Sequence, residues 1–361
     1  ACTGTAAREP CGGTTRMASP PGFRKTLQAS AAPLGALTLV AALGVLGTLG
    51  SLDRAWFDFL QRKTARSAPV PADTALVLID EQALAALGRP EYGYRWPWPR
   101  RAFAGLFASL HRAGAKAVVA DFNFFEASED PMQDYEFGAL AAALPELTLG
   151  AMPAAADKKE QLPVIWPADF RESNAACFQR PRWGYTRSVP DEDSVIRRYS
   201  ARDSLAAVAT QRNTGLSAAP QLLRWRGSLA DLRARGVPVL TAVPFAVDGL
   251  AVVKRAAEAA SDLEPAALAQ AVAAEPAPEE ALTREAFAKV RGRVVFVGVN
   301  AAGTYDYVAT PCGAPEPGVI SHWTAHANLA TSGFMRETGP WASAGALVVL
   351  VAALGWVARG G

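Results

Sequence analysis

The sequence is poor in the residues and motifs on which most enzyme sites are built. It has four cysteines and three histidines in 361 residues. It contains no glycine-rich loop with a phosphate-binding lysine, and the loop AAGTYD has one glycine and no lysine. Neither a GxSxG elbow nor a catalytic cysteine–histidine pattern is present. The sequence therefore lacks the common motifs of enzymes that hydrolyse nucleotides or esters. We expect neither an enzymatic activity nor a cofactor.

The sequence also lacks a surplus of either charge. Its formal net charge is +2. No basic run carries the interleaved aromatic residues on which nucleic-acid bases stack. We therefore expect no nucleic-acid partner.

Cysteine is too scarce for a disulfide framework. Cys2 and Cys11 precede Met17, in a stretch rich in glycine, threonine and alanine that is typical of upstream sequence or an unstructured tail. The remaining pair, Cys177 and Cys312, is the candidate for one disulfide if the domain lies in an oxidising compartment. The alternative is that these two residues are unrelated and simply small and apolar.

Two long uncharged runs divide the chain. Residues 29–52 would form a helix about 36 Å long, which exceeds a hydrocarbon core of about 30 Å. Residues 340–358 are also uncharged. We predict a transmembrane helix for each run, with membrane lipid as a partner, and a disordered or cytoplasmic lead at residues 1–28. Basic residues flank the first run on both sides, so charge leaves the orientation open.

Residues 53–339, between the predicted spans, have the mixed polarity of a globular domain. A buried strand at Ala75–Ile79 is followed by a short helix, a main helix that begins at Pro99, and a second strand at residues 116–120. This order of strand, crossover and strand predicts an α/β fold with a mostly parallel sheet and flanking helices. The fold is predicted to lie between two transmembrane helices.

The later part of the domain is less regular. Residues 211–282 are interpreted as an elaboration on the fold, with one short strand candidate at Val237–Val243. The clearest buried strand of the chain follows at Val294–Val299.

Polar side chains stand at the ends of the predicted strands. Asp80, Asp121 and Asn300 each follow a strand, and Asp306 comes shortly after the last one. Because ligands of open parallel sheets bind beyond the carboxyl ends of the strands, we expect these four residues to share a crevice. The carboxylates can bind Mg²⁺ or Ca²⁺, or they can cap helices and tie loops by hydrogen bonds. We assign no metal to them.

An aromatic loop precedes the main helix. Trp96 and Trp98 alternate with Pro97 and Pro99, and Arg100 follows. Indole faces and a guanidinium can hold an organic anion or a cation, or the same residues can seal the sheet edge and start a helix.

His322 and His326 lie four residues apart on a predicted helix, so one face can offer two nitrogen ligands to zinc. Position 323 is tryptophan, where a zinc protease carries its glutamate base, so the pair by itself is weak evidence for a metal.

Several segments together resemble the CHASE domain of type 2, an extracytoplasmic sensory domain of bacterial receptors. The resemblance rests on LVLIDEQALAALG with WPWPR, GAKAVVADFNF, DEDSVIRR, and RVVFVGVNAAGTYD with TP and PGV, in the same order over residues 53–335. It implies that residues 53–339 lie in the periplasm or outside the cell. It also implies an N-terminal span before the domain and a cytoplasmic output, such as an adenylate cyclase or a protein kinase, beyond this chain.

The resemblance also carries over particular positions, whose roles family membership does not settle. They are Asp80, Trp96, Pro97, Pro99, Arg100, Asp121, Asp193, Arg197, Arg198, Gly298, Asp306, Thr310, Pro311, Pro317 and Gly318. The chain departs from the pattern at Ser194, where glycine is usual, and at Ile320, where an acidic residue is usual.

The leading hypothesis is a signal-sensing input module that binds a small-molecule or peptide signal, acts as a homodimer and passes a conformational change to the spans. The candidate ligand-binding residues are Asp80, Trp96, Trp98, Arg100, Asp121, Asn300, Asp306 and Thr310. The alternative is a membrane-tethered, metal-dependent periplasmic hydrolase that uses Asp80, Asp121 and Asp306. A third interpretation is a structural assembly module without a ligand.

Overall fold

A computed structural model describes most of the domain between the predicted spans. It divides into two units, residues 56–336 and residues 1–55 with 337–361. The described residues are 48–124, 126–152, 182–186, 188–212, 215–259, 265–304, 306–337, 349, 353 and 356. The predicted spans lie almost entirely outside these ranges. Within the described residues, no helix has both the length and the apolar character needed to cross a bilayer.

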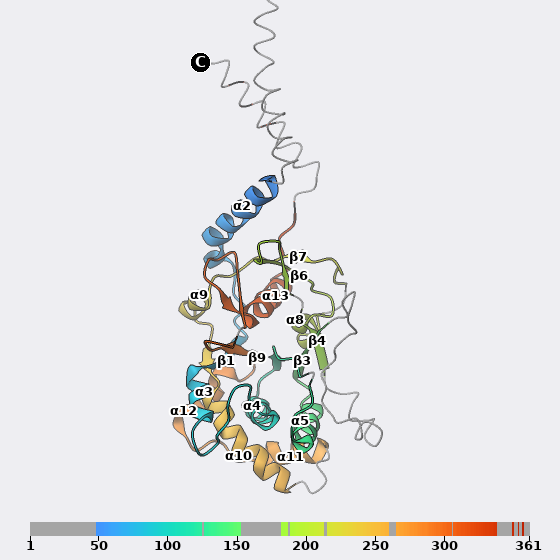
Figure 1. The fold of residues 1–361 in the computed structure, drawn as a ribbon, viewed down its shortest axis with the longest axis vertical. Coiled ribbons are helices and arrows are strands. Elements are labelled where there is room, and N and C mark those ends of the chain that lie inside the picture. The colour runs from blue at the N-terminus through green and yellow to red at the C-terminus, as the bar shows by residue number, and fades with distance from the viewer. Residues whose placement is uncertain are drawn as a thin grey trace, which may run out of the picture. The chain divides into compact units, whose positions relative to one another are not determined.

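A six-stranded parallel sheet forms the centre of the larger unit (Figure 1), in the order β4-β3-β2-β9-β1-β8. The α/β fold with a parallel sheet is therefore confirmed. The strands are β1 (Thr74–Asp80), β2 (Ala117–Ala120), β3 (Leu147–Ala151), β4 (Arg182–Tyr185), β8 (Val239–Thr241) and β9 (Val294–Asn300).

The sheet order separates the two strands of the predicted opening unit. β1 and β2 are parallel, but β9 lies between them and pairs with both. The seven residues of β9 and β1 are in register, from Thr74 opposite Val294 to Asp80 opposite Asn300. The buried run that is clearest in the sequence thus occupies the middle of the sheet, where strands are covered on both faces.

Helices cover one face of the sheet in a thick layer (Figure 1). Phe103, Leu106, Phe107 and Leu110 of the main helix are buried, as the helical spacing predicts. This helix, α4, starts one residue after Pro99, which is its N-cap. The layer consists of α3 (Glu81–Leu87), α4 (Arg100–Arg112), α5 (Pro131–Ala143), α10 (Val243–Ala259), α11 (Pro265–Ala274) and α12 (Ala281–Val290).

Residues 211–282, interpreted from the sequence as an elaboration with one strand candidate, contribute that strand to the central sheet and a long helix to its cover. This stretch supplies β8, the edge strand that pairs with β1, and α10, which crosses α4 against the sheet. The crossing is close because Gly105 and Gly249 face each other: a Cβ atom on Gly249 would lie 1.9 Å from the Gly105 oxygen. Proline and alanine are frequent in this stretch, so its sequence shows no clear pattern of buried and exposed positions that would indicate its place in the core.

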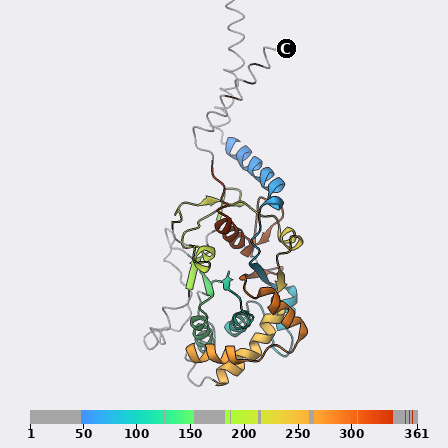
Figure 2. The same cartoon turned by 180° about the vertical axis from the view of Figure 1, so that it is seen from behind.

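Smaller elements cover the opposite face, as the view from behind also shows (Figure 2). Here the indole Nε1 of Trp323 donates a hydrogen bond to the Thr74 hydroxyl at 3.1 Å and joins α13 (Val319–Thr331) to the start of β1. The part of α2 (Thr48–Thr64) that belongs to this unit, residues 56–64, packs on this side through Asp58 and Gln61. The other elements are β5 (Ser188–Pro190), β6 (Ile196–Tyr199), α8 (Leu205–Ala209), β7 (Gln221–Leu222), α9 (Leu229–Ala234), β10 (Tyr307–Val308), β11 (Glu316–Pro317) and α13 (Val319–Thr331).

Candidate functional site

Two of the predicted site residues stand side by side at the carboxyl end of the sheet and hold loops in place. Asp80 Oδ1 accepts a hydrogen bond from the Ala83 N–H at 3.0 Å, which caps α3, and another from the Thr241 hydroxyl at 2.8 Å. Asn300 Oδ1 accepts from the Tyr307 hydroxyl at 3.1 Å. For Asp80 and Asn300, the alternative of capping and loop tying therefore describes the geometry.

The structure brings Asp121 and Asp306 together with His322, and it separates their contacts from those of Asp80. His322 Nε2 lies 3.3 Å from Asp121 Oδ1, and Nδ1 lies 2.6 Å from the Tyr199 hydroxyl. Burial, and then repulsion by Asp121, raise the pKa of Asp306 to about 7, while His322 acts in the opposite direction. A buried polar group with a carboxyl that titrates near neutrality thus links β2, the loop after β9, β6 and α13.

The two histidines do not act as a pair. His322 is engaged on both nitrogens, whereas both nitrogens of His326 are buried without a described hydrogen-bond partner. The His326 ring packs against Phe296 at 5.5 Å, and burial lowers its pKa to about 4. Among the described residues no group of three or more histidine, cysteine, aspartate or glutamate side chains could hold a metal ion. The metal-dependent hydrolase has no support in this geometry.

Thr310 and Cys312 lie in the loop between β10 and β11. Thr310 is buried, and its hydroxyl accepts a hydrogen bond from the Cys312 N–H at 3.3 Å. Burial raises the pKa of the Cys312 thiol to about 11. Cys177 lies outside the described residues, so the disulfide remains a prediction.

The aromatic loop packs inward and also borders a cavity. Trp98 is 3% exposed, and the half-buried Trp96 packs beside it at 6.1 Å between ring centroids. Arg100 Nε donates to Asp134 at 3.0 Å, and its guanidinium lies 4.7 Å from the centre of the Phe124 ring. The cavity has a volume of about 870 Å³, within the range of small-molecule sites. Its lining is Pro97, Trp98, Pro99, Arg100, Asn123, Glu126, Ala127, Ser128, Glu129, Asp130 and Gln133.

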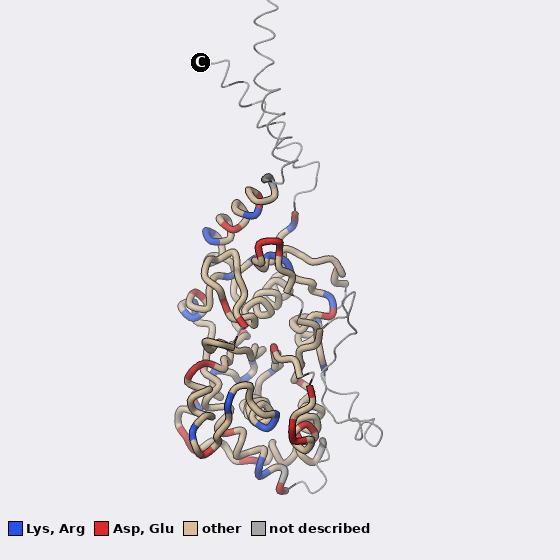
Figure 3. The backbone as a smooth tube through the Cα atoms, in the orientation of Figure 1, with Lys and Arg blue, Asp and Glu red and all other residues tan. Residues whose placement is uncertain are grey.

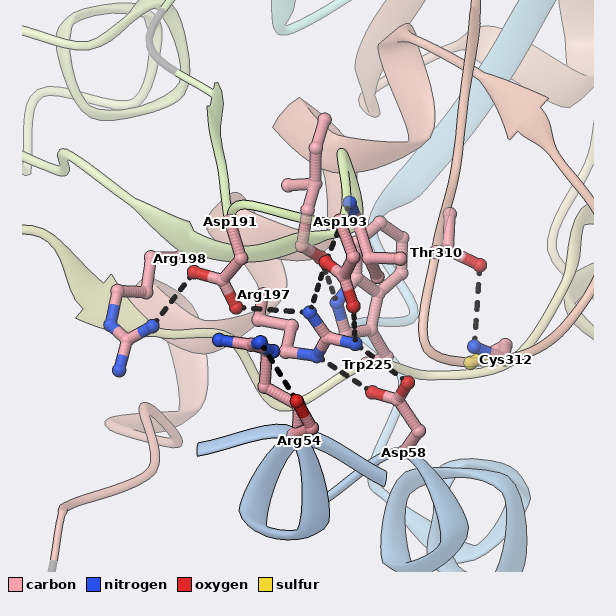
Figure 4. Close-up of polar contacts among 12 residues, drawn as sticks. Arg54, Asp58, Asp191, Asp193, Arg197, Arg198, Trp225, Thr310 and Cys312 are labelled. Carbon is pink, nitrogen blue, oxygen red and sulfur yellow. Dashed lines mark hydrogen bonds and ion pairs between the residues drawn. The ribbon is translucent and has the colours of Figure 1, made fainter. Parts of the chain in front are cut away.

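A second cluster surrounds Arg197. The turn between β5 and β6, which contributes to this cluster, is acidic (Figure 3). Arg197 is 2% exposed and lies between three carboxylates (Figure 4). Its guanidinium contacts Asp58 of α2 at 2.7 Å, Asp191 at 3.0 Å and Asp193 at 2.8 Å. Burial lowers the pKa of Arg197, but hydrogen bonds to these carboxylates outweigh it and raise the pKa above its ordinary value. Arg198 also pairs with Asp191, at 2.8 Å.

Sequence reasoning missed Asp58 and Gln61, which attach α2 to the domain. Gln61 is 1% exposed, and its Oε1 accepts a hydrogen bond from the Trp225 N–H at 3.0 Å. Its Nε2 lies 2.7 Å from the sulfur of Met335. Met335 in turn donates its N–H to the Leu222 carbonyl at 2.9 Å. Asp58 and Gln61 stand three residues apart on one helical face, and that spacing was the available signal.

Close packing explains two of the positions that the resemblance carried over, and backbone conformation or burial describes the two at which the chain departs from the pattern. A Cβ atom on Gly298 would lie 2.5 Å from the Val319 side chain, and one on Gly318 would lie 2.6 Å from Asp306 Oδ1. Ser194, at the position where glycine is usual, has a φ of 63°. Ile320 is fully buried and therefore unavailable as a surface contact.

Comparison with known proteins gives one family. The CHASE2 domain matches residues 35–359, nearly the whole chain. No curated protein and no solved structure matches. CHASE2 domains are extracytoplasmic sensory domains, and they are not catalytic. The order of motifs, the parallel sheet and the length of the match agree, and the chain belongs to the CHASE2 domain family.

Proposed function

We propose that this chain is the signal-sensing input module of a bacterial transmembrane receptor. Residues 53–339 face the periplasm or the cell exterior, residues 29–52 and 340–358 cross the membrane, and the output is an adenylate cyclase or protein kinase beyond residue 361. The CHASE2 family membership supports the sensory role. The predicted spans flank the domain on both sides.

The observation that carries the proposal is the junction at Gln61. The buried amide of Gln61 contacts Trp225 in the middle of the domain and Met335 near its C-terminal end. One side chain of α2 therefore connects both parts of the domain. The Asp58–Arg197 ion pair lies one helical turn away and fixes α2 to β6. A rearrangement of β6 or of residues 222–225 therefore acts on both predicted tethers together.

A signal shifts the domain only if it binds one of two conformations more tightly than the other. For the change to reach α2, the side chains at the junction have to contact different partners in the two conformations. The buried Arg197 cluster suits this task, because a guanidinium among three carboxylates can exchange partners without losing its charge compensation.

The proposed assembly is a homodimer formed along α2. Trp56 and Phe59 are 59% and 42% exposed and stack at 5.4 Å between ring centroids. Asp58 and Gln61 occupy the opposite side of the same helix and face their own domain. A second copy of α2 would cover the exposed aromatic side.

The test removes one charge at the junction. Asp58→Asn, in the full chain fused to its cyclase or kinase output, is expected to change basal output at least about threefold, because it leaves Arg197 with one ionic partner fewer. Hydrogen exchange at residues 56–64 and 333–336 is expected to rise in the same variant.

Asp73→Asn is the matched control, since Asp73 is half exposed and its only described ion pair is a 3.5 Å contact to Lys116. Equal output from the wild type, the control and Asp58→Asn would contradict the proposed coupling. Reporter fusions that place residues 53–339 in the cytoplasm would contradict the receptor itself.

A further inference from the structure

A chain of polar side chains runs from the end of β2 to β6 through His322. The imidazole is buried, with Nε2 3.3 Å from Asp121 Oδ1 and Nδ1 2.6 Å from the hydroxyl of the fully buried Tyr199. Because a carboxylate can only accept, Nε2 carries a hydrogen, and Nδ1 of the neutral ring then accepts from the Tyr199 hydroxyl. The neutral imidazole thus has one hydrogen arrangement that fits both contacts.

An additional proton on His322 reverses the contact with β6. Nδ1 becomes a donor, so the Tyr199 oxygen has to accept and the hydroxyl hydrogen turns away from the ring. Both contacts of the imidazole are then charge-assisted, and such hydrogen bonds are roughly twice as strong as neutral ones. Protonation of His322 therefore tightens the attachment of β6 to α13.

A second carboxyl lies at the start of α13. Asp306 is half-buried, a Cβ atom on Gly318 would lie 2.6 Å from Asp306 Oδ1, and the Gly318 N–H donates to the Asp306 carbonyl at 2.8 Å. Asp121 and Asp306 repel each other, and among the described residues neither forms an ion pair with a lysine or an arginine. A proton bound anywhere in the group of Asp121, Asp306 and His322 reduces its net negative charge, and coupled groups of this kind titrate together.

One other buried carboxyl belongs to an adjoining element. Glu316 of β11 accepts a hydrogen bond from the Leu229 N–H at 3.0 Å, and burial raises its pKa as well. Glu316 is therefore a competing origin of proton uptake, which the experiment has to separate from the group. The remaining charged and titratable side chains of the adjoining elements have contacts of their own: Arg197 and Arg198 of β6 pair with Asp191, Tyr307 of β10 bonds to Asn300, and His326 of α13 packs against Phe296.

The start of α13 is attached to the β5–β6 hairpin at two points. One is the imidazole contact with β6, and the other is the 2.6 Å hydrogen bond between the Ser188 and Ser321 hydroxyls. The same hairpin carries Arg197, whose guanidinium binds Asp58 of α2 at 2.7 Å. Direct contacts thus lead from the two carboxyls to α2.

We propose that the contact between the β5–β6 hairpin and α13 depends on a proton bound by Asp121, Asp306 and His322, so that it tightens in acid and loosens as the pH rises. Protons are thereby a regulatory input to the domain beside its signal. Transmission of this input to the output rests on the proposed function. The proton-dependent contact itself is measured in the full chain without any output.

The experiment follows the Tyr199 hydroxyl by NMR in the full chain, with carbon-13 at the tyrosine ring carbon that bears the hydroxyl and with EDTA to remove metal ions. Tyr199→Phe identifies the signal. Between pH 5 and pH 8 the Tyr199 signal is expected to shift in one transition with a midpoint near pH 7, because the hydroxyl changes between acceptor and donor. Hydrogen exchange of residues 188–199, corrected for the intrinsic effect of pH, is expected to be at least about threefold faster at pH 8 than at pH 6.

The variants then locate the proton. Asp121→Asn and Asp306→Asn each remove one negative charge from the group, so each is expected to lower the midpoint by at least about one pH unit. Glu316→Gln keeps an acceptor for the Leu229 N–H and is the matched control, expected to keep the wild-type midpoint. Hydrogen exchange of the wild type needs no substitution, so it remains decisive where a buried variant fails to fold.

Three results would overturn the proposal: a Tyr199 signal that stays constant over this range, hairpin exchange that is no faster at pH 8 than at pH 6, or a transition that Glu316→Gln removes and Asp306→Asn keeps. A Tyr199 transition in a chain whose output is unchanged by Asp58→Asn would keep the proton-dependent contact and refute the coupling to the output.

Discussion

At the scale of single residues, the candidate site separates into groups that hold the fold and groups that can respond to conditions. Asp80 and Asn300 tie loops at the ends of adjacent strands. Asp306 differs because it is half-buried close to a second carboxyl, and its pKa of about 7 means that protonation changes within the physiological range. Its charge is felt by His322 and Asp121, so proton uptake alters the start of α13.

The pKa of Asp306 gives a pH prediction whose sign follows from linkage. The ordinary value is 3.8 and the folded value is about 7, so the folded state binds this proton more tightly. The contribution of Asp306 to stability is therefore full below about pH 4 and is lost as the pH rises toward and through 7.

Asp306→Asn removes this titration. We expect the difference in melting temperature, Asp306→Asn minus wild type, to increase by roughly 2–5 °C from pH 5 to pH 8, because only the wild type loses stability through this carboxyl. Thermal denaturation of both proteins at several pH values measures it. The pKa of His326 is lowered to about 4, so both proteins lose the same amount of stability through His326 as the pH falls from 6.5 toward 4. A constant difference between the two proteins would refute the prediction.

At the scale of elements, the contact between α4 and α10 is decided by two glycines. Alanine favours a helix over glycine by about 1 kcal/mol, so propensity alone predicts that Gly249→Ala stabilises the protein. The Gly105 backbone occupies the space that the new methyl group needs. Overpacking of this kind costs about 1–3 kcal/mol and occasionally more.

We therefore predict that Gly249→Ala destabilises the domain by about 2 kcal/mol or more, measured by denaturant unfolding. Ala251→Gly, at an exposed position on the same helix, is expected to cost about 1 kcal/mol through propensity alone. A more stable Gly249→Ala protein would mean that the two helices are farther apart than the structure places them.

The exposed side of α2 gives a second prediction about an element. Replacement of both Trp56 and Phe59 by alanine is expected to shift the chain from dimer to monomer, with a dissociation constant raised at least about tenfold, because aromatic anchors dominate such interfaces. Sedimentation in detergent measures the shift. Met132→Ala, another exposed apolar side chain (48%), is the control. A wild-type monomer would exclude the dimer and leave lipid as the partner of this face.

At the scale of the whole molecule, α2 completes the face of the domain that carries α13 and the β5–β6–β7 sheet. Asp58 and Gln61 satisfy Arg197 and the Trp225 backbone N–H, both of which are buried. Loss of α2 leaves a buried guanidinium with fewer partners and a backbone donor with none.

A chain that lacks residues 1–64 is accordingly expected to melt at least about 5 °C lower than the full chain, with tryptophan emission shifted to longer wavelength as Trp225 becomes accessible. Removal of residues 1–28 alone keeps α2 and is the matched control. Identical melting and emission of the two truncated chains would show that α2 does not belong to the folded domain.

The sequence by itself determined the fold class and the members of the sheet centre. Runs such as Ala75–Ile79 and Val294–Val299 are apolar without interruption, and that pattern depends only on burial of both strand faces. The order of motifs also indicated the family. These features are local, so they can be recognised along the chain.

Only the tertiary structure decided the strand order, the place of α10 in the core and the partners of the polar residues. Gly105 meets Gly249, and Asp58 meets Arg197, across sequence separations that carry no periodic signal. The same is true of the charge at the cavity, where Arg100 is compensated by Asp134. Pairing between distant residues depends on how the helices and strands pack, so one sequence without the fold could not assign these contacts.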